Sequence, residues 1–419
     1  MKKRSDPARG LFKWTSLSSA AVVIVLALGC SPGPAPQPDE QENTAQDRTE
    51  VFRRIEKLAS MEMERWRVPG LAIGIVMDGK FVYAHGFGYR DPNLGLEVTT
   101  TTNFSLASMT KSFTAMVIGL MVEDGILGWD TPVHEHAPEF MLPDPGLSST
   151  VTFRDLLSHR TGLADKNELW TSGEYTSEEI LEHIDDMETV GQLRRHFEYN
   201  NILYIASAEL VGKLTGTPWD IIAAQRLLHP MGMSNTGFSV QQLLRSDEYS
   251  FSFSEENGAY IANEFPGPEH NAWYFTRGSG SMYSNVEDMA RWMVFQLNEG
   301  KYEGSQLVSA SIVRATHEPQ ITLDNPPFYI DYPCINSQAY GMGWYLDEYR
   351  SHHRVHHGGA SMGYSNYITL FPEDRIGIVI LSNRQVLMPV ELMYYASDIL
   401  LELPQKDWAS RFEKYVPSN

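Results

Sequence analysis

The stretch NFSLASMTKSFTAMVIGLMVEDGILGWDTPV, residues 103–133, decides the fold. It contains the only Ser-x-x-Lys sequence of the chain, from Ser108 to Lys111. Apolar residues after it recur on one face of a helix, and Gly125 is a typical helix stop. Residues three apart on a helix share a face, so the Lys111 amine would reach the Ser108 hydroxyl. The stretch therefore predicts a helix that opens with this serine and lysine side by side.

A serine hydroxyl becomes a nucleophile when a neighbouring base takes its proton. A lysine amine serves as that base when burial or a nearby charge lowers its pKa. The free N–H groups and the dipole of a first helical turn also favour negative charge that develops there. The pair indicates nucleophilic chemistry. By itself, however, a serine three residues before a lysine on a helix is usually just a pair of surface residues without a catalytic role.

Further segments follow in order: VTFRDLLSHRTGL at 151–163, FEYNNILYIASAELVGKLTG at 197–216, GSGSMYSNVEDMARWM at 278–293 and YGMGW at 340–344. With the opening stretch they resemble the serine β-lactamase and penicillin-binding superfamily, in its class C-like branch, from about residue 50 to 403. The resemblance implies an α/β fold. An antiparallel sheet built from both chain ends would be flanked by helices and would carry an inserted all-α domain.

Three tyrosines compete for the Tyr-x-Asn motif of that superfamily. Tyr283 belongs to the segment before a helix, and Tyr364 follows the third motif, which is the wrong order. Tyr199 lies where a loop enters a helix, as in the superfamily. With Ser108 as the nucleophile, the resemblance makes Tyr199 and Lys111 the acid/base pair. It makes Asn201 a hydrogen-bond partner of Lys111 or of a substrate amide.

The third motif of the superfamily matches His357, Gly358 and Gly359, which would bind substrate. By the same resemblance, the backbone N–H groups of Ala360 and Ser108 form an oxyanion hole. Two such donors stabilise a tetrahedral intermediate, and loss of a donor of this kind typically costs about 3 kcal/mol of barrier. The expected reaction is acyl transfer through a covalent acyl-enzyme.

Histidines gather at this motif, in HHRVHH at residues 352–357. Some of them have the i, i+4 spacing of metal ligands. They precede a Gly-Gly pair and a strand pattern, and no cluster of carboxylates accompanies them. The sequence therefore predicts no metal ion, and the resemblance implies no cofactor.

GGASMG, residues 358–363, places Ser361 in a G-x-S-x-G sequence, which is typical of the α/β-hydrolase nucleophile. That class orders its triad as serine, acid and histidine, yet no histidine follows residue 357. A strand pattern rather than a helix follows Ser361. Ser361 is therefore predicted not to be the nucleophile. The opposite hypothesis requires that Ser361→Ala abolish activity and that Ser108→Ala leave it.

Strand patterns are concentrated at both ends of the chain. β-rich runs flank Asp78-Gly79, and residues 367–383 form a second hairpin pattern. Helical patterns cover residues 49–66 and about 389–401. We expect one hydrolase domain at 48–403, with sheet at about 48–100 and 302–403, a helical part at about 101–301, and a tail at 404–419.

The N-terminus resembles an export signal, in which basic residues precede an apolar run too short to span a membrane. Ala27 to Cys30 resembles a bacterial lipobox, which predicts a signal at 1–29 and a lipid on Cys30. An ordinary signal or an uncleaved anchor stays open. Residues 30–47 are proline-rich and polar, which predicts a disordered tether. We expect an exported, lipid-anchored protein of the bacterial cell envelope, facing the periplasm or the exterior.

The composition is that of a large acidic globular chain. Hydrophobic residues make up 42% of the 419 residues, enough for a sizeable core. Acidic residues outnumber basic ones by 53 to 33, and the net charge of -20 disfavours binding to nucleic acid. Besides Cys30 the chain has one cysteine, Cys334, which we expect to be a buried structural thiol.

The resemblance leaves the substrate open among β-lactams, D-amino-acid peptides and esters. True class C β-lactamases have Lys-Thr-Gly where this chain has His-Gly-Gly, so a hydroxyl and, near neutral pH, a charge are lost. This difference favours an esterase or peptidase-like activity over strong β-lactamase activity. The alternative is a non-catalytic lipoprotein that binds β-lactam or peptidoglycan and is acylated without turnover.

Overall fold

The computed structural model describes residues 40–263, 276–323 and 335–417. The chain divides into a unit at residues 1–47 and a unit at residues 48–419. The predicted signal, Cys30 and Cys334 lie outside the described residues, and helix α1 (Glu40–Trp66) begins inside the segment predicted to be a tether. None of the helices in the described part of the chain combines the length and apolar character needed to cross a membrane.

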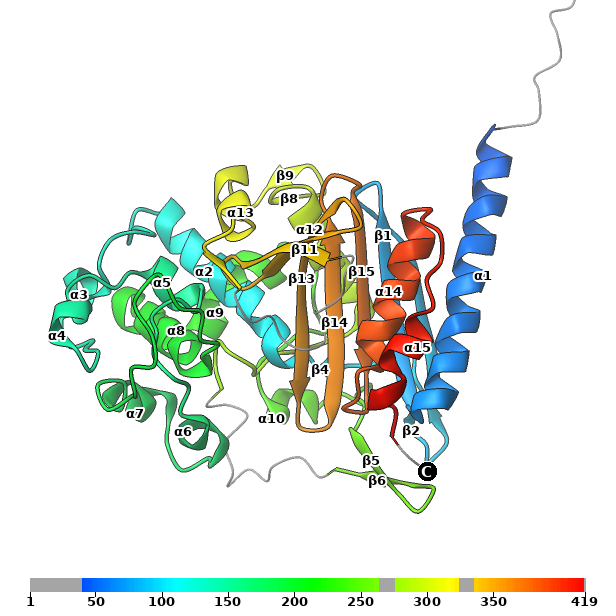
Figure 1. Cartoon of the computed structure of the whole chain (residues 1–419), viewed down its shortest axis with the longest axis horizontal. Coiled ribbons are helices and arrows are strands. Elements are labelled where there is room, and N and C mark those ends of the chain that lie inside the picture. The colour runs from blue at the N-terminus through cyan, green and yellow to red at the C-terminus, as the bar shows by residue number, and fades with distance from the viewer. Residues whose placement is uncertain (1–39, 264–275, 324–334, 418–419) are drawn as a thin grey trace, which may run out of the picture. The chain divides into compact units, whose positions relative to one another are not determined.

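A nine-stranded antiparallel sheet is the centre of the unit at 48–419 (Figure 1). Its order is β10-β11-β12-β13-β14-β15-β1-β2-β3. The strands are β1 (Gly70–Met77), β2 (Lys80–Asp91), β3 (Leu96–Glu97), β10 (Ile321–Thr322), β11 (Ile335–Tyr340), β12 (Tyr345–Tyr349), β13 (His352–Ser361), β14 (Tyr364–Phe371) and β15 (Ile376–Ser382). Because β1 pairs with β15, the sheet joins both chain ends, as the sequence predicted.

Both predicted hairpins are present. Asp78 and Gly79 have φ angles of 53° and 66°, the left-handed pair that a tight turn between β1 and β2 requires. Strands β14 and β15 form the second hairpin. The helical pattern near the C-terminus is α14 (Met388–Leu400).

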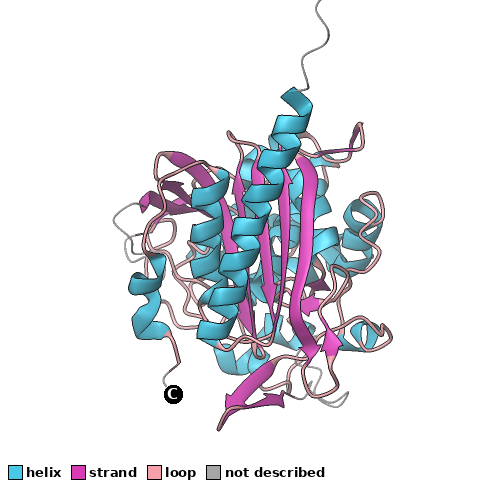
Figure 2. Cartoon of the chain, turned by 90° about the vertical axis from the view of Figure 1, so that its right-hand side faces the viewer, coloured by secondary structure: helices cyan, strands magenta, loops and turns pink. Residues whose placement is uncertain are grey.

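Helices α1, from Arg48 on, and α14 cover one face of the sheet, as Figure 2 shows. Leu71, Ile73 and Ile75 of β1 belong to the buried cluster on this face, with Trp66 of α1. Ala72 and Val76 belong to the cluster on the opposite face. This alternation follows from the two-residue period of a strand, so β1 has a core on both sides.

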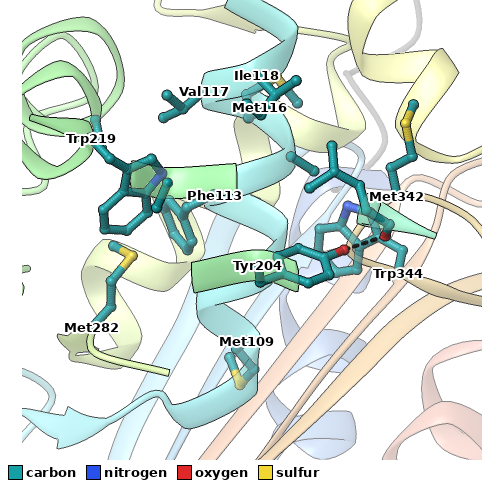
Figure 3. Packing of buried hydrophobic residues seen from close by; sticks show 14 of the residues in the cluster. Met109, Phe113, Met116, Val117, Ile118, Tyr204, Trp219, Met282, Met342 and Trp344 are labelled. Atoms are coloured by element: carbon teal, nitrogen blue, oxygen red, sulfur yellow. Dashed lines mark hydrogen bonds between the residues drawn. The ribbon is translucent and has the colours of Figure 1, made fainter. Parts of the chain in front are cut away.

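Helix α2 (Thr110–Glu123) lies on the opposite face and joins the sheet to the helical part. It is buried on all sides rather than on one face, because α8 (Asn201–Thr215), α9 (Trp219–Ala223) and α13 (Ala310–Thr316) pack around it. Figure 3 shows Trp219 and Met282 beside Phe113 of α2. Phe113 also stacks on Trp292, with ring centroids 3.9 Å apart.

Within the described residues, the other α-helices are α3 (Val133–His136), α4 (Pro145–Ser148), α5 (Phe153–Leu157), α6 (Asn167–Thr171), α7 (Ser177–Glu182), α8 (Asn201–Thr215), α9 (Trp219–Ala223), α10 (Val240–Leu243), α12 (Val286–Leu297), α13 (Ala310–Thr316) and α15 (Trp408–Phe412). Short strand pairs stand among them: β4 (Phe104–Ser105) with β7 (Tyr283–Ser284), β5 (Phe253–Glu256) with β6 (Ala259–Ala262), and β8 (Lys301–Tyr302) with β9 (Ser305–Gln306). The insertion is therefore mainly, but not purely, helical.

Candidate active site

Ser108 lies in a 3₁₀ turn, Ala107–Met109, directly before α2. Ala107 has a φ of 46°, a left-handed conformation that residues other than glycine rarely adopt. Contacts from both sides hold the chain that leads into this turn. Leu106 N–H donates to Met282 O at 2.8 Å, and Asn366 Nδ2 donates to Ser105 O at 2.6 Å. The sheet and the helical part thus fix Ser108 at their junction.

Lys111 is fully buried, and its Nζ contacts three oxygens. They are Ser108 Oγ at 3.2 Å, Asn201 Oδ1 at 2.7 Å and the Ser279 carbonyl oxygen at 3.0 Å. A neutral amine has two N–H donors and one lone pair. The Asn201 and Ser279 oxygens can only accept, so they take the two N–H groups. The lone pair is then left for the Ser108 hydroxyl, which is the geometry of a general base.

The electrostatics at Lys111 suit the same role. Burial lowers the pKa of Lys111 to about 7, against the opposing effect of the Asp165 carboxylate, which raises it. The Tyr199 and Tyr204 rings lie with their centroids 4.8 and 5.4 Å from Nζ. A substantial fraction of the amine is therefore neutral at physiological pH.

Tyr199 is placed by the loop that enters α8. Its ring packs on His159, with centroids 4.3 Å apart. The neighbouring Asn200 caps α8 by accepting from Leu203 N–H at 3.1 Å, and its own N–H donates to His159 Nδ1 at 3.0 Å. Segments 151–163 and 197–216, both singled out in the sequence, thus meet beside Lys111.

Two hollows open at Ser108. The larger, of about 550 Å³, includes Trp170 and Met362, and the smaller, of about 350 Å³, lies along β13 and β14. Ser108, Tyr199 and Ala360 line both of them. Among the described residues, the linings contain no carboxylate, ammonium or guanidinium group. The described part of the lining is therefore uncharged on both sides of the nucleophile.

The third motif lies on β13 beside the nucleophile turn. A Cβ added at Gly359 would stand 2.1 Å from the Leu106 carbonyl oxygen, so only glycine allows this approach. His357 Nδ1 donates to Gly358 O at 2.6 Å, and its Nε2 faces the Tyr340 hydroxyl at 3.1 Å. Burial lowers the pKa of His357 to about 3, so the ring is neutral. His357 lines the smaller hollow, and a hydrogen bond from its ring to substrate would replace one of these two bonds.

Ser361 ends β13, and Met362 and Gly363, with φ angles of 51° and 86°, turn the chain directly into β14. This hairpin differs from the strand–turn–helix elbow of the α/β-hydrolase nucleophile. Ser361 is one of the residues that line the larger hollow. The other two tyrosine candidates, Tyr283 and Tyr364, line neither hollow.

Three of the four histidines of HHRVHH have separate partners. His352 Nδ1 lies 2.9 Å from Asp374, and His356 Nε2 lies 3.0 Å from Asp347, while His357 bonds as described above. No group of three or more metal-binding side chains occurs within residues 40–263, 276–323 and 335–417. These contacts account for His352, His356 and His357.

Two residues that influence Lys111 were not predicted from the sequence. Ser279 contributes only its carbonyl oxygen, and a backbone group leaves no signal in residue type. Asp165 bonds to the Asn201 amide, with Oδ2 accepting from Nδ2 at 2.9 Å. Its position two residues after the segment 151–163 is the one signal that could have indicated it.

A sheet made from both chain ends, a helical insertion and a Ser-x-x-Lys pair at their junction define the class of serine β-lactamases and penicillin-binding proteins. The sequence model of the Beta-lactamase family matches residues 55–400. The chain belongs to the β-lactamase family, which confirms the resemblance found in the sequence.

Proteins similar to this chain come from different organisms and have different names. Protein flp of Staphylococcus aureus is 26% identical over 333 residues, which are 78% of this chain and 62% of flp. The unguisins hydrolase ungD' of Aspergillus campestris is 27% identical over 379 residues, 85% of this chain and 67% of that protein. The octameric penicillin-binding protein homologue from Pyrococcus abyssi superposes with a TM-score of 0.75 and 25% identity, over 88% of this chain and 82% of that one. The chain thus spans less than two thirds of the length of flp.

Proposed function

We propose that this protein is a serine hydrolase in which Ser108 is the nucleophile and Lys111 the general base. The observation that carries the proposal is the hydrogen bonding of Lys111, which leaves its lone pair to Ser108 Oγ. The match to the β-lactamase family and the hydrolase name of the Aspergillus relative support it. Tyr199, whose ring packs against Nζ, is proposed to share the proton with Lys111.

The proposed reaction has two stages. Ser108 Oγ gives its proton to Lys111 and attacks the carbonyl carbon of the substrate, and the Ser108 and Ala360 N–H groups stabilise the oxyanion. The Lys111–Tyr199 pair then protonates the leaving group as the bond to it breaks, which leaves an acyl-serine. Water hydrolyses this ester, returning the proton to the oxygen of Ser108.

The proposed substrate has an uncharged acyl group, and an ester or a peptide-like amide is favoured over a β-lactam. A β-lactam antibiotic carries a carboxylate, and no cationic side chain among the described residues lines either hollow. The neutral His357 at the third motif supplies no positive charge in its place. An uncharged ester has no carboxylate, so it needs neither a cationic side chain nor a positively charged His357 to bind.

The test compares hydrolysis of a short-chain p-nitrophenyl ester with that of a chromogenic cephalosporin, with Ser108→Ala as the blank. Ester turnover that exceeds cephalosporin turnover, with both lost in Ser108→Ala, is the expected result. Efficient cephalosporin opening would refute the substrate preference. A single burst without turnover would identify the protein as one that is acylated but does not hydrolyse. Activity that persists in Ser108→Ala would refute the proposed nucleophile.

A further inference from the structure

Asp165 is a carboxylate at the site to which the proposed chemistry gives no role. Its Oδ2 accepts from Asn201 Nδ2 at 2.9 Å, and its Oδ1 accepts from Ile202 N–H at 3.4 Å. The other end of the same amide, Asn201 Oδ1, accepts from Lys111 Nζ at 2.7 Å. One amide therefore connects the carboxylate to the amine.

The two ends of the Asn201 amide are similar in shape and opposite in hydrogen bonding. If the amide rotated by half a turn, its nitrogen would face Lys111 and donate to the lone pair of the neutral amine. That lone pair is the one that must receive the Ser108 proton. An ionised carboxylate only accepts, so Asp165 forms its bond with the amide nitrogen and opposes this rotation.

We propose that Asp165 is a positioning residue that holds the Asn201 amide with its oxygen toward Lys111 and so keeps the lone pair of Lys111 for Ser108. The inference rests on the proposed function of Lys111 as the base. Asp165 is absent from the described linings of both hollows, so it acts through Asn201 rather than on substrate.

Asp165 also affects the charge of the amine. The titratable groups that face Lys111 are Tyr199, Tyr204, His159, His357 and Asp165. Burial lowers the pKa of both histidines far enough to keep them neutral. Burial raises the pKa of Asp165, while the bonds from Asn201 and Ile202 and the nearby Lys111 oppose this shift and favour the carboxylate whose charge acts on Lys111. Because a nearby anion favours the ammonium form, its removal lowers the pKa of Lys111. The acid limb of the pH–rate profile should then move to lower pH.

The experiment measures kcat, KM and their pH dependence on a p-nitrophenyl ester for the full-length protein. Asp165→Ala is expected to lower kcat by about 10- to 100-fold, as misorientation of a catalytic group does, with little change in KM. Asp165→Asn, which has the same shape and can still accept from Asn201, should retain more of kcat and show the same acid shift. Glu168→Gln, an exposed carboxylate nearby, should match the wild type in both measurements.

A double-mutant cycle with Asn201→Ala tests the route of the effect. If Asp165 acts through Asn201, adding Asp165→Ala to Asn201→Ala lowers kcat no further. Losses that multiply would overturn the proposal, and so would a wild-type kcat and pH profile in Asp165→Ala. In either case, an inactive Ser108→Ala would leave the proposed function standing. Activity in Ser108→Ala would remove both together.

Discussion

Replacing Gly359 by alanine should separate catalysis from folding. The added Cβ would meet the Leu106 carbonyl oxygen at 2.1 Å, while such contacts are essentially never shorter than 3.0 Å. Strand β13 and the nucleophile turn must therefore move apart by roughly 0.9 Å, the difference between these distances. That shift falls between Ser108 and Ala360, the two proposed oxyanion donors. A misplacement of about 1 Å can cost about 100-fold in rate.

The assay is kcat/KM for a p-nitrophenyl ester, together with a thermal melt. We expect Gly359→Ala to lose about 100-fold in kcat/KM while it still unfolds in one cooperative transition. Gly358→Ala is the matched comparison, because its Cβ would lie 3.3 Å from the edge of the Tyr367 ring, beyond the 3.0 Å below which something must shift. Its loss should be clearly smaller. Wild-type kcat/KM in Gly359→Ala would refute the idea that the close approach of Gly359 to the Leu106 carbonyl oxygen sets the distance between Ser108 and Ala360.

Three further outcomes are expected. The rate of ester hydrolysis should rise with pH and reach half its plateau near pH 7. Burial lowers the pKa of Lys111 to about 7, and only the neutral amine accepts a proton. A flat pH–rate profile from about pH 5 to 9 would contradict this. Asp347→Ala should lower the free energy of unfolding by about 3–5 kcal/mol in urea titrations, since it leaves the buried Arg354 guanidinium without the carboxylate it now binds at 2.6 and 2.8 Å. Trp292→Ala, which removes a fully buried ring stacked on Phe113, should cost about 3–5 kcal/mol by the same titration, and a loss under 1 kcal/mol would contradict the packing described.

The parts of the site that depend on local spacing could be predicted from the sequence. Ser108 in the 3₁₀ turn and Lys111 in the first turn of α2 are three residues apart, and their contact follows from the helical course of the chain. The turn at Asp78-Gly79 follows from residues that tolerate positive φ. The same signal occurs at Asn257-Gly258, where φ angles of 51° and 82° turn β5 into β6. That hairpin was predictable but was missed inside a segment taken as helical.

The remaining parts depend on contacts between distant segments. Asp165 and Asn201 are neighbours because the loop before α6 packs against the first residue of α8, and no local pattern reveals this. The left-handed Ala107 is held by tertiary bonds, against the preference of the residue itself. The neutral state of His357 likewise follows from burial rather than from its place in a motif. Sequence patterns supplied the candidate side chains, and packing supplied their protonation and orientation.

The pairing of β1 with β15 has a consequence for how the protein acquires activity during synthesis. Leu71 emerges from the ribosome early and Ser382 late, yet the two stand opposite each other in the sheet. Such a long loop is slow to close, and the central strands cannot assemble on a partly made chain. Ser108 is likewise made long before Ala360, its proposed partner at the oxyanion. A nascent or truncated chain should therefore carry the nucleophile without the means to use it, and hydrolysis should begin only after the last strand has been added.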